Sequence, residues 1–252
     1  MKKIVKWITE EELKGIYTSE YWNDIEEEKK KEWWIEDGNY ERCLKYLNKS
    51  LMGEYKKSEN FICNFDGDNI KIADLAAGIG WTSVLISKIK KVKEVHSVEI
   101  SKHRIGALFE NSVKMLSGES DKIFRYLGSF YDLKFEDNSL DIIYMSQAFH
   151  HADAPLRLLY ECDRVLKNNG RVILVGESYI PIKRILRRFL FNIVRTKTIR
   201  FNFYELFPPD QVLGDHYYRV SDYMFMFHSL GYSLDYVRLD TGNVIYIADK
   251  LK

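Results

Sequence analysis

Two carboxylates, Asp74 and Glu99, lie near the ends of two apolar runs. Side chains at such positions can bind a ligand at the edge of a parallel sheet. Residues 71–80 read KIADLAAGIG, a buried-strand pattern that passes through Asp74 into a turn of small residues, and residues 94–100 read EVHSVEI. Ligands of open parallel sheets bind outside the carboxyl ends of the strands, so both acids are expected to face one crevice. We predict a nucleoside site there, in which Glu99 accepts hydrogen bonds from a ribose diol.

The turn after Asp74 decides which nucleoside derivative fits. Its small residues are Ala76, Ala77, Gly78 and Gly80. Small residues let the backbone approach a ligand closely. A dinucleotide fingerprint needs a third glycine where this chain has Ser83, and the Asp74 carboxylate would repel a pyrophosphate. An anionic side chain at this point suits a cationic ligand instead, such as S-adenosylmethionine with its amino and sulfonium groups.

At these residues the chain resembles the class I S-adenosylmethionine-dependent methyltransferases, in particular small-molecule enzymes with a methyltransferase-11-like domain. Their first motif, D-x-G-x-G-x-G, matches Asp74 to Gly80 with Ala76 at the first glycine. Residues 126–151 resemble the family's run from the adenine loop through the fourth strand, and residues 166–176 resemble its L-K-P-G-G turn and fifth strand. The resemblance covers residues 68 to 178 and departs from the family's usual acid at Ser129.

The resemblance implies that the chain binds S-adenosylmethionine and releases S-adenosylhomocysteine. The implied contacts are Asp74, Ala76, Gly78 and Gly80 for the methionine moiety, Glu99 for the ribose, Ile100, Ser129 and Phe130 for adenine, and Met145 and Ser146 for the sulfonium. Ser129 is a neutral partner for the adenine amino group, so we expect it to contribute less than an acid would.

Further polar residues are candidates for work on the methyl acceptor. His150 and His151 follow the fourth predicted strand, and Asp215 and His216 are adjacent after the fifth. Methyl transfer is an in-line displacement, so the enzyme mainly aligns the two reactants, and a base is needed only for a protonated acceptor such as a hydroxyl. We name all four as candidate catalytic residues, with purely structural roles as the alternative. None has dedicated metal-ligand spacing, and we predict no metal site.

Strand and helix patterns alternate from residue 69 to residue 248, which indicates a mostly parallel sheet. We predict strands near residues 70–75, 94–99, 123–127, 140–145 and 171–176, and helices near 81–89, 103–116, 154–166 and 221–230. Residues 233–248 have a hairpin pattern with a turn at 240–243. The predicted fold is an α/β, doubly wound, Rossmann-like sheet of seven mostly parallel strands with the antiparallel last strand that the resemblance implies.

Two additions accompany the predicted methyltransferase domain of residues 61–252. Residues 1–60 read as a helical N-terminal extension with a helix at 39–52, and Tyr21, Trp22, Trp33, Trp34 and Tyr40 make it unusually aromatic. It forms either a lid over the methyl donor or simple packing on the sheet edge. A cap insertion at residues 178–220 follows the fifth strand.

The cap contains a basic amphipathic helix near residues 182–195. Its apolar residues keep helical spacing, while Lys183, Arg184, Arg187, Arg188 and Arg195 occupy the other face. No acid occurs between Glu177 and Glu205. Three interpretations stay open: a cap helix with a solvated basic face, contact with an anionic membrane surface, or capture of an anionic acceptor.

Composition agrees with a soluble enzyme and excludes little else. The 252 residues are 46% hydrophobic and carry a net charge of +1, which gives no global attraction to nucleic acid. Three scattered cysteines, and the lack of a signal-peptide pattern in the printed sequence, favour a cytoplasmic location, with peripheral membrane contact through the basic helix left open. A nucleic-acid methyltransferase is disfavoured, because no N-P-P-[YF]-like motif follows Asp141.

We expect methyl transfer from S-adenosylmethionine to a small molecule, by preference O-methylation of an anionic, sugar-linked or lipid-like acceptor. Two alternatives belong to other classes: an NAD-dependent oxidoreductase, and a non-catalytic nucleoside-binding module with a membrane or protein partner. The identity of the acceptor and the oligomeric state do not follow from the sequence.

Overall fold

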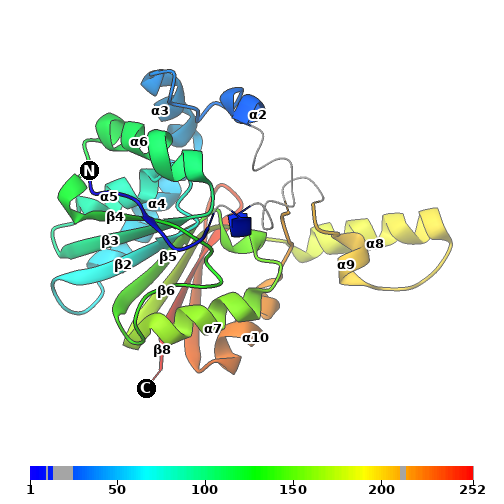
Figure 1. Cartoon of the computed structure of the whole chain (residues 1–252). Coiled ribbons are helices and arrows are strands. Elements are labelled where there is room, and N and C mark those ends of the chain that lie inside the picture. Colours follow the sequence, from blue (N-terminus) through cyan, green and yellow to red (C-terminus); the bar gives the residue numbers. More distant parts are fainter. Residues whose placement is uncertain (10, 14–24, 211–213, 252) are drawn as a thin grey trace.

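The computed structural model describes residues 1–9, 11–13, 25–210 and 214–251, and a single sheet lies at its centre (Figure 1). The strands are β1 (Val5–Lys6), β2 (Ile70–Leu75), β3 (Val92–Glu99), β4 (Ile123–Leu127), β5 (Leu140–Ser146), β6 (Leu166–Ser178), β7 (Tyr232–Arg238) and β8 (Asn243–Lys250). Their order is β1-β4-β3-β2-β5-β6-β8-β7. β8 runs antiparallel to both of its neighbours, and the other pairs are parallel. The predicted doubly wound sheet with an antiparallel last strand is confirmed.

Helices cover both faces of the sheet, because successive strand residues point to opposite sides. Ile72 and Ile142 belong to one core, and their chain neighbours Ala73 and Ile143 belong to the other. The first core is covered by α3 (Tyr40–Lys49), α4 (Leu51–Cys63), α5 (Trp81–Ser87) and α6 (Phe109–Leu116), and the second by α7 (Pro155–Val165) and α10 (Val220–Ser229). Both faces of β2 and β5 are therefore buried, as their nearly continuous apolar sequences require.

The N-terminal extension was expected to be helical, but part of it forms a strand. Val5 and Lys6 pair with Tyr126 and Leu127, which adds β1 as an eighth strand at the sheet edge. A strand of two residues carries no readable alternation, so only the tertiary pairing reveals it. Trp7 then packs over Gly128, where a Cβ would lie 2.9 Å from the indole ring.

The predicted boundary between extension and domain, at residue 60, falls inside a helix. The helix expected at residues 39–52 ends as α3 at Lys49, and a second helix, α4, continues to Cys63 past the bend at Ser50. Tyr55 and Ile62 of α4 are buried in the same core as the sheet. α4 is therefore part of the sheet's helical layer.

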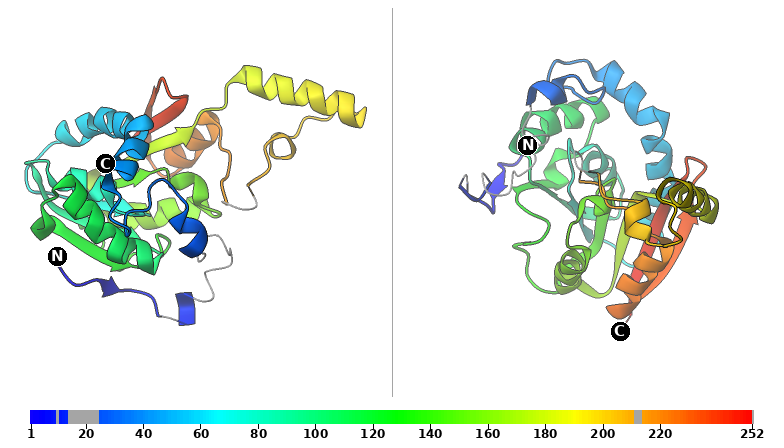
Figure 2. Two further views of the ribbon diagram at one scale, coloured as in Figure 1. Left: turned by 90° about the horizontal axis from the view of Figure 1, so that it is seen from above. Right: turned by 90° about the vertical axis from the view of Figure 1, so that its right-hand side faces the viewer.

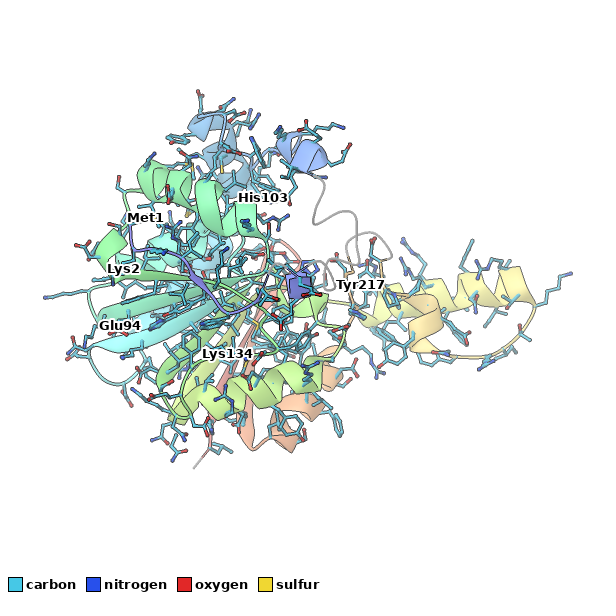
Figure 3. The ribbon with its side chains drawn as sticks, in the orientation of Figure 1. Met1, Lys2, Glu94, His103, Lys134 and Tyr217 are labelled. Atoms are coloured by element: carbon cyan, nitrogen blue, oxygen red, sulfur yellow. The ribbon has the colours of Figure 1, made fainter. Side chains whose placement is uncertain are left out.

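The insertion after β6 forms an arm made of α8 (Ile182–Thr196) and α9 (Phe203–Leu206), which extends away from the sheet (Figures 1 and 2). No residue of α8 is buried. A small apolar cluster at its base joins α8 to α9 through Ile185, Phe189 and Phe207, and Tyr217 packs against this cluster where the arm meets the body (Figure 3). α8 is thus an exposed arm, and it does not lie as a cap with its apolar face on the body.

Within the described residues, no helix has the length and apolar character needed to cross a membrane.

Candidate active site

The turn after β2 has three residues in the left-handed backbone region, which glycine adopts freely and residues with a Cβ adopt only with strain. Ala76, Gly78 and Gly80 have φ angles of 53°, 56° and 76°, in the left-handed region. Gly80 begins α5, and a Cβ there would lie 2.1 Å from the ring of the fully buried Phe109. The turn is therefore fixed by backbone conformation at one end and by close packing at the other.

Asp74 lies beneath this turn and is only 1% exposed. Its Oδ2 accepts hydrogen bonds from Thr82 Oγ1 at 2.7 Å and Ser83 Oγ at 2.5 Å, so it anchors the first turn of α5. Burial, only partly opposed by these two hydroxyls, raises the pKa of Asp74 to about 6. Asp74 does not line either cavity described below, so the contact predicted for it is not direct. Its Oδ1 is buried and has no hydrogen-bond partner among the described residues.

Glu99 faces the turn from the end of β3. Its two carboxylate oxygens accept one backbone hydrogen bond each, from Gly78 and Ser101, both at 2.8 Å. Glu99 lines a cavity of about 140 Å³ together with Ile100, Ser129 and Phe130, the residues predicted to surround adenine. Each oxygen keeps a second lone pair, which a ribose hydroxyl can use.

A second cavity of about 150 Å³ lies on the other side of Ala76, which lines both. Gly78, Ser146 and Gln147 form its floor, and Trp33 of the N-terminal extension also lines it. Met145 does not reach it, because alternation along β5 turns that side chain into the core, where it is fully buried. Tyr21 and Trp22, also named for the lid, lie outside the described residues.

The extension is fastened to the body beside this second cavity. Glu28 of α2 (Ile25–Lys29) is fully buried and accepts hydrogen bonds from Arg104 Nε at 2.8 Å and from His103 Nε2. Arg104 also stacks over Trp33, with 4.9 Å from the guanidinium carbon to the ring centroid. Trp33 is therefore held over the turn after β2.

These features fit S-adenosylmethionine. Two cavities that meet at Ala76 can accept the two ends of an extended nucleoside. Nothing lies within 4 Å of a Cβ placed on Gly78, so the space above the turn is open. The unpaired Oδ1 of buried Asp74 supplies negative potential near the second cavity, which Thr82, its hydrogen-bond partner, lines, and this suits a cation.

His150 lies between two carboxylates on the acceptor side. Its Nδ1 is 3.2 Å from Oε2 of Glu177, at the end of β6, and Tyr223 donates its hydroxyl to the same oxygen at 2.7 Å. Burial alone would lower the pKa of His150, but the charges of Glu177 and Asp215 outweigh it and raise the pKa. Neither Glu177 nor Tyr223 was predicted. The argument used for Asp74 and Glu99, that an acid near the carboxyl end of a parallel strand faces the ligand site, also applies to Glu177 and would have identified it.

Asp215 joins this cluster from the segment after the arm. Its Oδ1 lies 3.0 Å from His151 Nδ1 and 4.0 Å from His150 Nε2. The contact with His151 lowers the pKa of Asp215, and the charge of His150 adds to the effect. The backbone N–H of His216 donates to the His150 carbonyl at 2.7 Å, while its ring stacks on Tyr218. Three of the four predicted acceptor-side residues thus bring their side chains together, and His216 links the two loops through its backbone.

An apolar cavity of about 420 Å³ adjoins these loops. Ala154 comes from the loop after β5, Tyr204 from α9 and Tyr218 from the segment that follows Asp215, and all three line it. Residues from three separate segments therefore line one cavity, although His150, His151, Asp215 and His216 are not among them.

The chain is similar to methyltransferases in sequence. Residues 73–174 match the family model described as methyltransferase domain. The chain is 30% identical over 127 residues to the uncharacterized methyltransferase YcgJ of Bacillus subtilis, a match that covers 50% of this chain and 48% of the relative. It is 28% identical over 103 residues to the sarcosine/dimethylglycine N-methyltransferase of Aphanothece halophytica, covering 40% and 35%. The chain therefore spans less than half the length of either curated relative.

The fold is similar to that of solved methyltransferases. The geranyl diphosphate C-methyltransferase of Streptomyces coelicolor, whose structure contains S-adenosyl-L-homocysteine, aligns with a TM-score of 0.61 at 12% identity, over 84% of each chain. At this identity the likeness shows the fold alone.

Proposed function

We propose that this chain, which belongs to the class I S-adenosylmethionine-dependent methyltransferases, methylates a hydroxyl oxygen of a small molecule. The observation that carries the proposal is the pair of cavities meeting at Ala76, with the cluster of His150, His151 and Asp215 at the same edge of the sheet. The cofactor supplies an electrophilic methyl group when bound. The protein's own residues then have two tasks, which are to hold the cofactor and to align the acceptor oxygen.

The first task falls to the loop residues. Glu99 accepts the ribose hydroxyls, Ile100, Ser129 and Phe130 enclose the adenine, and the backbone at Ala76 and Gly78 approaches the methionine moiety. Asp74 acts from below, by anchoring α5 and by its negative charge. Trp33 covers the methionine end and excludes water, which is the role of a lid.

The second task falls to the acceptor-side cluster. Lone pairs on the histidines and Asp215 accept the hydrogen bond of an acceptor hydroxyl, orient its oxygen and take its proton as the carbon–oxygen bond forms. The names of similar proteins include an N- and a C-methyltransferase, so similarity does not select the acceptor atom. The preference for oxygen rests on the cluster, because an alcohol hydroxyl is a weak nucleophile until a base takes its proton, whereas a neutral amine attacks without one.

The acceptor class follows from the apolar cavity and the arm. α8 carries seven basic residues together with its following loop, Lys183, Arg184, Arg187, Arg188, Arg195, Lys197 and Arg200, and exposes Leu186, Leu190 and Val194. An apolar stripe beside a cationic stripe suits an anionic, lipid-like acceptor or the membrane surface that contains it. Cytoplasmic location with peripheral membrane contact is therefore part of the proposal.

Charge reversal on the arm tests this part. Arg188 is a poor target because its Nη1 donates to the Leu206 carbonyl at 2.6 Å and its guanidinium lies over Phe207, so its loss would also detach α9. Lys183→Glu with Arg187→Glu changes exposed charges only. We expect this variant to lose sedimentation with phosphatidylglycerol vesicles, while Lys56→Glu with Lys57→Glu on α4 does not. Equal vesicle binding by all three proteins would contradict the membrane contact.

Ligand titration followed by an acceptor screen tests the function as a whole. We expect calorimetry to detect S-adenosylhomocysteine binding and no response to NAD⁺. Incubation with S-adenosylmethionine and a cell extract should then yield a product heavier by one methylene group. A response to NAD⁺ alone would favour the oxidoreductase, and cofactor binding without methyl transfer to any acceptor would favour the non-catalytic module.

A further inference from the structure

The acceptor-side cluster has the composition and spacing of a metal site, which the sequence did not suggest. His150, His151 and Asp215 each offer one ligand atom, and the three atoms lie within 4.8 Å of one another. The Asp215 oxygen is 3.0 Å from His151 Nδ1 and 4.0 Å from His150 Nε2. Tetrahedral ligands placed about 2.0–2.2 Å from a shared ion stand about 3.3–3.6 Å apart, so Asp215 and His151 are already close enough and His150 Nε2 would have to move slightly closer to Asp215.

We propose that His150, His151 and Asp215 bind a divalent transition-metal ion through His150 Nε2, His151 Nδ1 and an Asp215 carboxylate oxygen. Two imidazoles and one carboxylate favour zinc, cobalt, iron or manganese over magnesium and calcium, which prefer oxygen ligands. Three protein ligands leave coordination positions for a small molecule.

The surroundings of His150 are those of a metal-bound imidazole. Its Nδ1 is 3.2 Å from Glu177, so the proton on this nitrogen is held by a buried carboxylate and the lone pair of Nε2 faces Asp215. Tyr223 fixes Glu177 in turn by donating to the same oxygen at 2.7 Å. A carboxylate behind the second ring nitrogen is the usual support of a histidine ligand, since it sets the tautomer and the ring orientation.

The ligands come from two loops that are bound to each other. The His216 N–H donates to the His150 carbonyl at 2.7 Å, and the Tyr218 hydroxyl donates to the Ala152 carbonyl at 2.9 Å. These bonds place Asp215 over the two histidines independently of any ion. The site is therefore largely formed before the metal binds, which lowers the cost of binding.

The role of the ion rests on the proposed function, although its binding does not. A metal in this cluster would coordinate the acceptor hydroxyl and make its proton more acidic, taking over the work assigned to the free imidazole and carboxylate. The metal-free alternative is an ion pair of His150 with Glu177 and Asp215.

Metal binding is measured on the whole chain after dialysis against a chelator. We expect one Co²⁺ per chain by calorimetry, with visible absorption bands of cobalt bound to nitrogen and oxygen, and displacement by Zn²⁺. His150→Ala and Asp215→Asn should each weaken binding at least about 10-fold, and Glu177→Gln should weaken it about 10-fold while leaving all three ligands in place. His228→Ala is the control, an exposed histidine on α10 outside the cluster, and should bind as the wild type does.

Two results would overturn the proposal: no Co²⁺ or Zn²⁺ binding by the wild type, or equal binding by His150→Ala and Asp215→Asn. Thermal melting of each metal-free variant shows whether it is folded. S-adenosylhomocysteine binding by the same samples separates the two proposals, because the cofactor cavities do not include the cluster. Loss of metal binding with retained cofactor binding contradicts only the metal site.

Discussion

Replacing Glu99 by Gln tests the nucleoside site most directly. Each carboxylate oxygen already accepts a backbone N–H, from Gly78 or Ser101, and the ribose hydroxyls must use the remaining lone pairs. Glutamine has one acceptor oxygen and one NH₂ group, so at least one of the two backbone donors then faces another donor. The substitution keeps the size and shape of the side chain and removes one of its two hydrogen-bond acceptors.

The expected loss of S-adenosylhomocysteine affinity follows from the hydrogen bonds that the ribose loses. A bound ribose loses at least one hydrogen bond to a charged group, which contributes about 1.5–3 kcal/mol. This corresponds to a dissociation constant for S-adenosylhomocysteine about 10- to 150-fold higher. The matched control is Glu94→Gln on the same strand, where the carboxylate pairs with Lys71 at 3.1 Å outside both cavities, and we expect unchanged binding.

Calorimetric titration with S-adenosylhomocysteine measures both variants, and thermal melting without ligand confirms that each is folded. If folded Glu99→Gln binds S-adenosylhomocysteine within about 2-fold of the wild type, the carboxylate does not hold the ribose and our reading of the cavity is refuted.

Four further substitutions give separate tests. Gly80→Ala should destabilise the fold by about 2–4 kcal/mol in urea unfolding, because its Cβ would lie 2.1 Å from the Phe109 ring and its φ is positive. Gly78→Ala, with open space at its Cβ, should instead mainly weaken S-adenosylhomocysteine binding, and the opposite ranking would contradict the assignment of the turn. Trp33→Ala should weaken cofactor binding about 10-fold with little change in the midpoint of urea unfolding. Unchanged binding would mean that the extension only packs on the sheet edge and is not a lid. Burial lowers the pKa of His96 from 6.5 to about 4 despite Glu94, so the unfolded chain binds more protons between these values and stability falls as the pH drops. About 2 kcal/mol should be lost between pH 7.5 and pH 5, and a His96→Gln variant with the same pH dependence would exclude His96 as the cause.

The sequence by itself determined the scaffold, and its resemblance to a family named several residues that line one of the two cavities beside the turn. The strand β2 was predicted with its observed limits, and Glu99, Ile100, Ser129 and Phe130 were named before they were found around one cavity. These features are local: apolar runs specify buried strands, small residues specify the turn, and parallel strands bring their carboxyl ends to one edge.

Local pattern did not determine the direction of single side chains. Met145 and Ser146 are neighbours on β5, yet only Ser146 reaches the cavity, because a strand turns successive side chains to opposite faces. Asp74 likewise ends beneath the turn, where two hydroxyls of α5 hold it.

Only the tertiary structure decided the acceptor side. His150 and Glu177 meet because β5 and β6 are neighbours in the sheet, and Asp215 reaches His151 after the chain has passed through the whole arm. The exposure of α8 and the pairing of β1 were settled in the same way, by which surfaces the rest of the fold covers. Contacts between residues far apart in the chain depend on loop closure and packing, and neither leaves a periodic signal in the sequence.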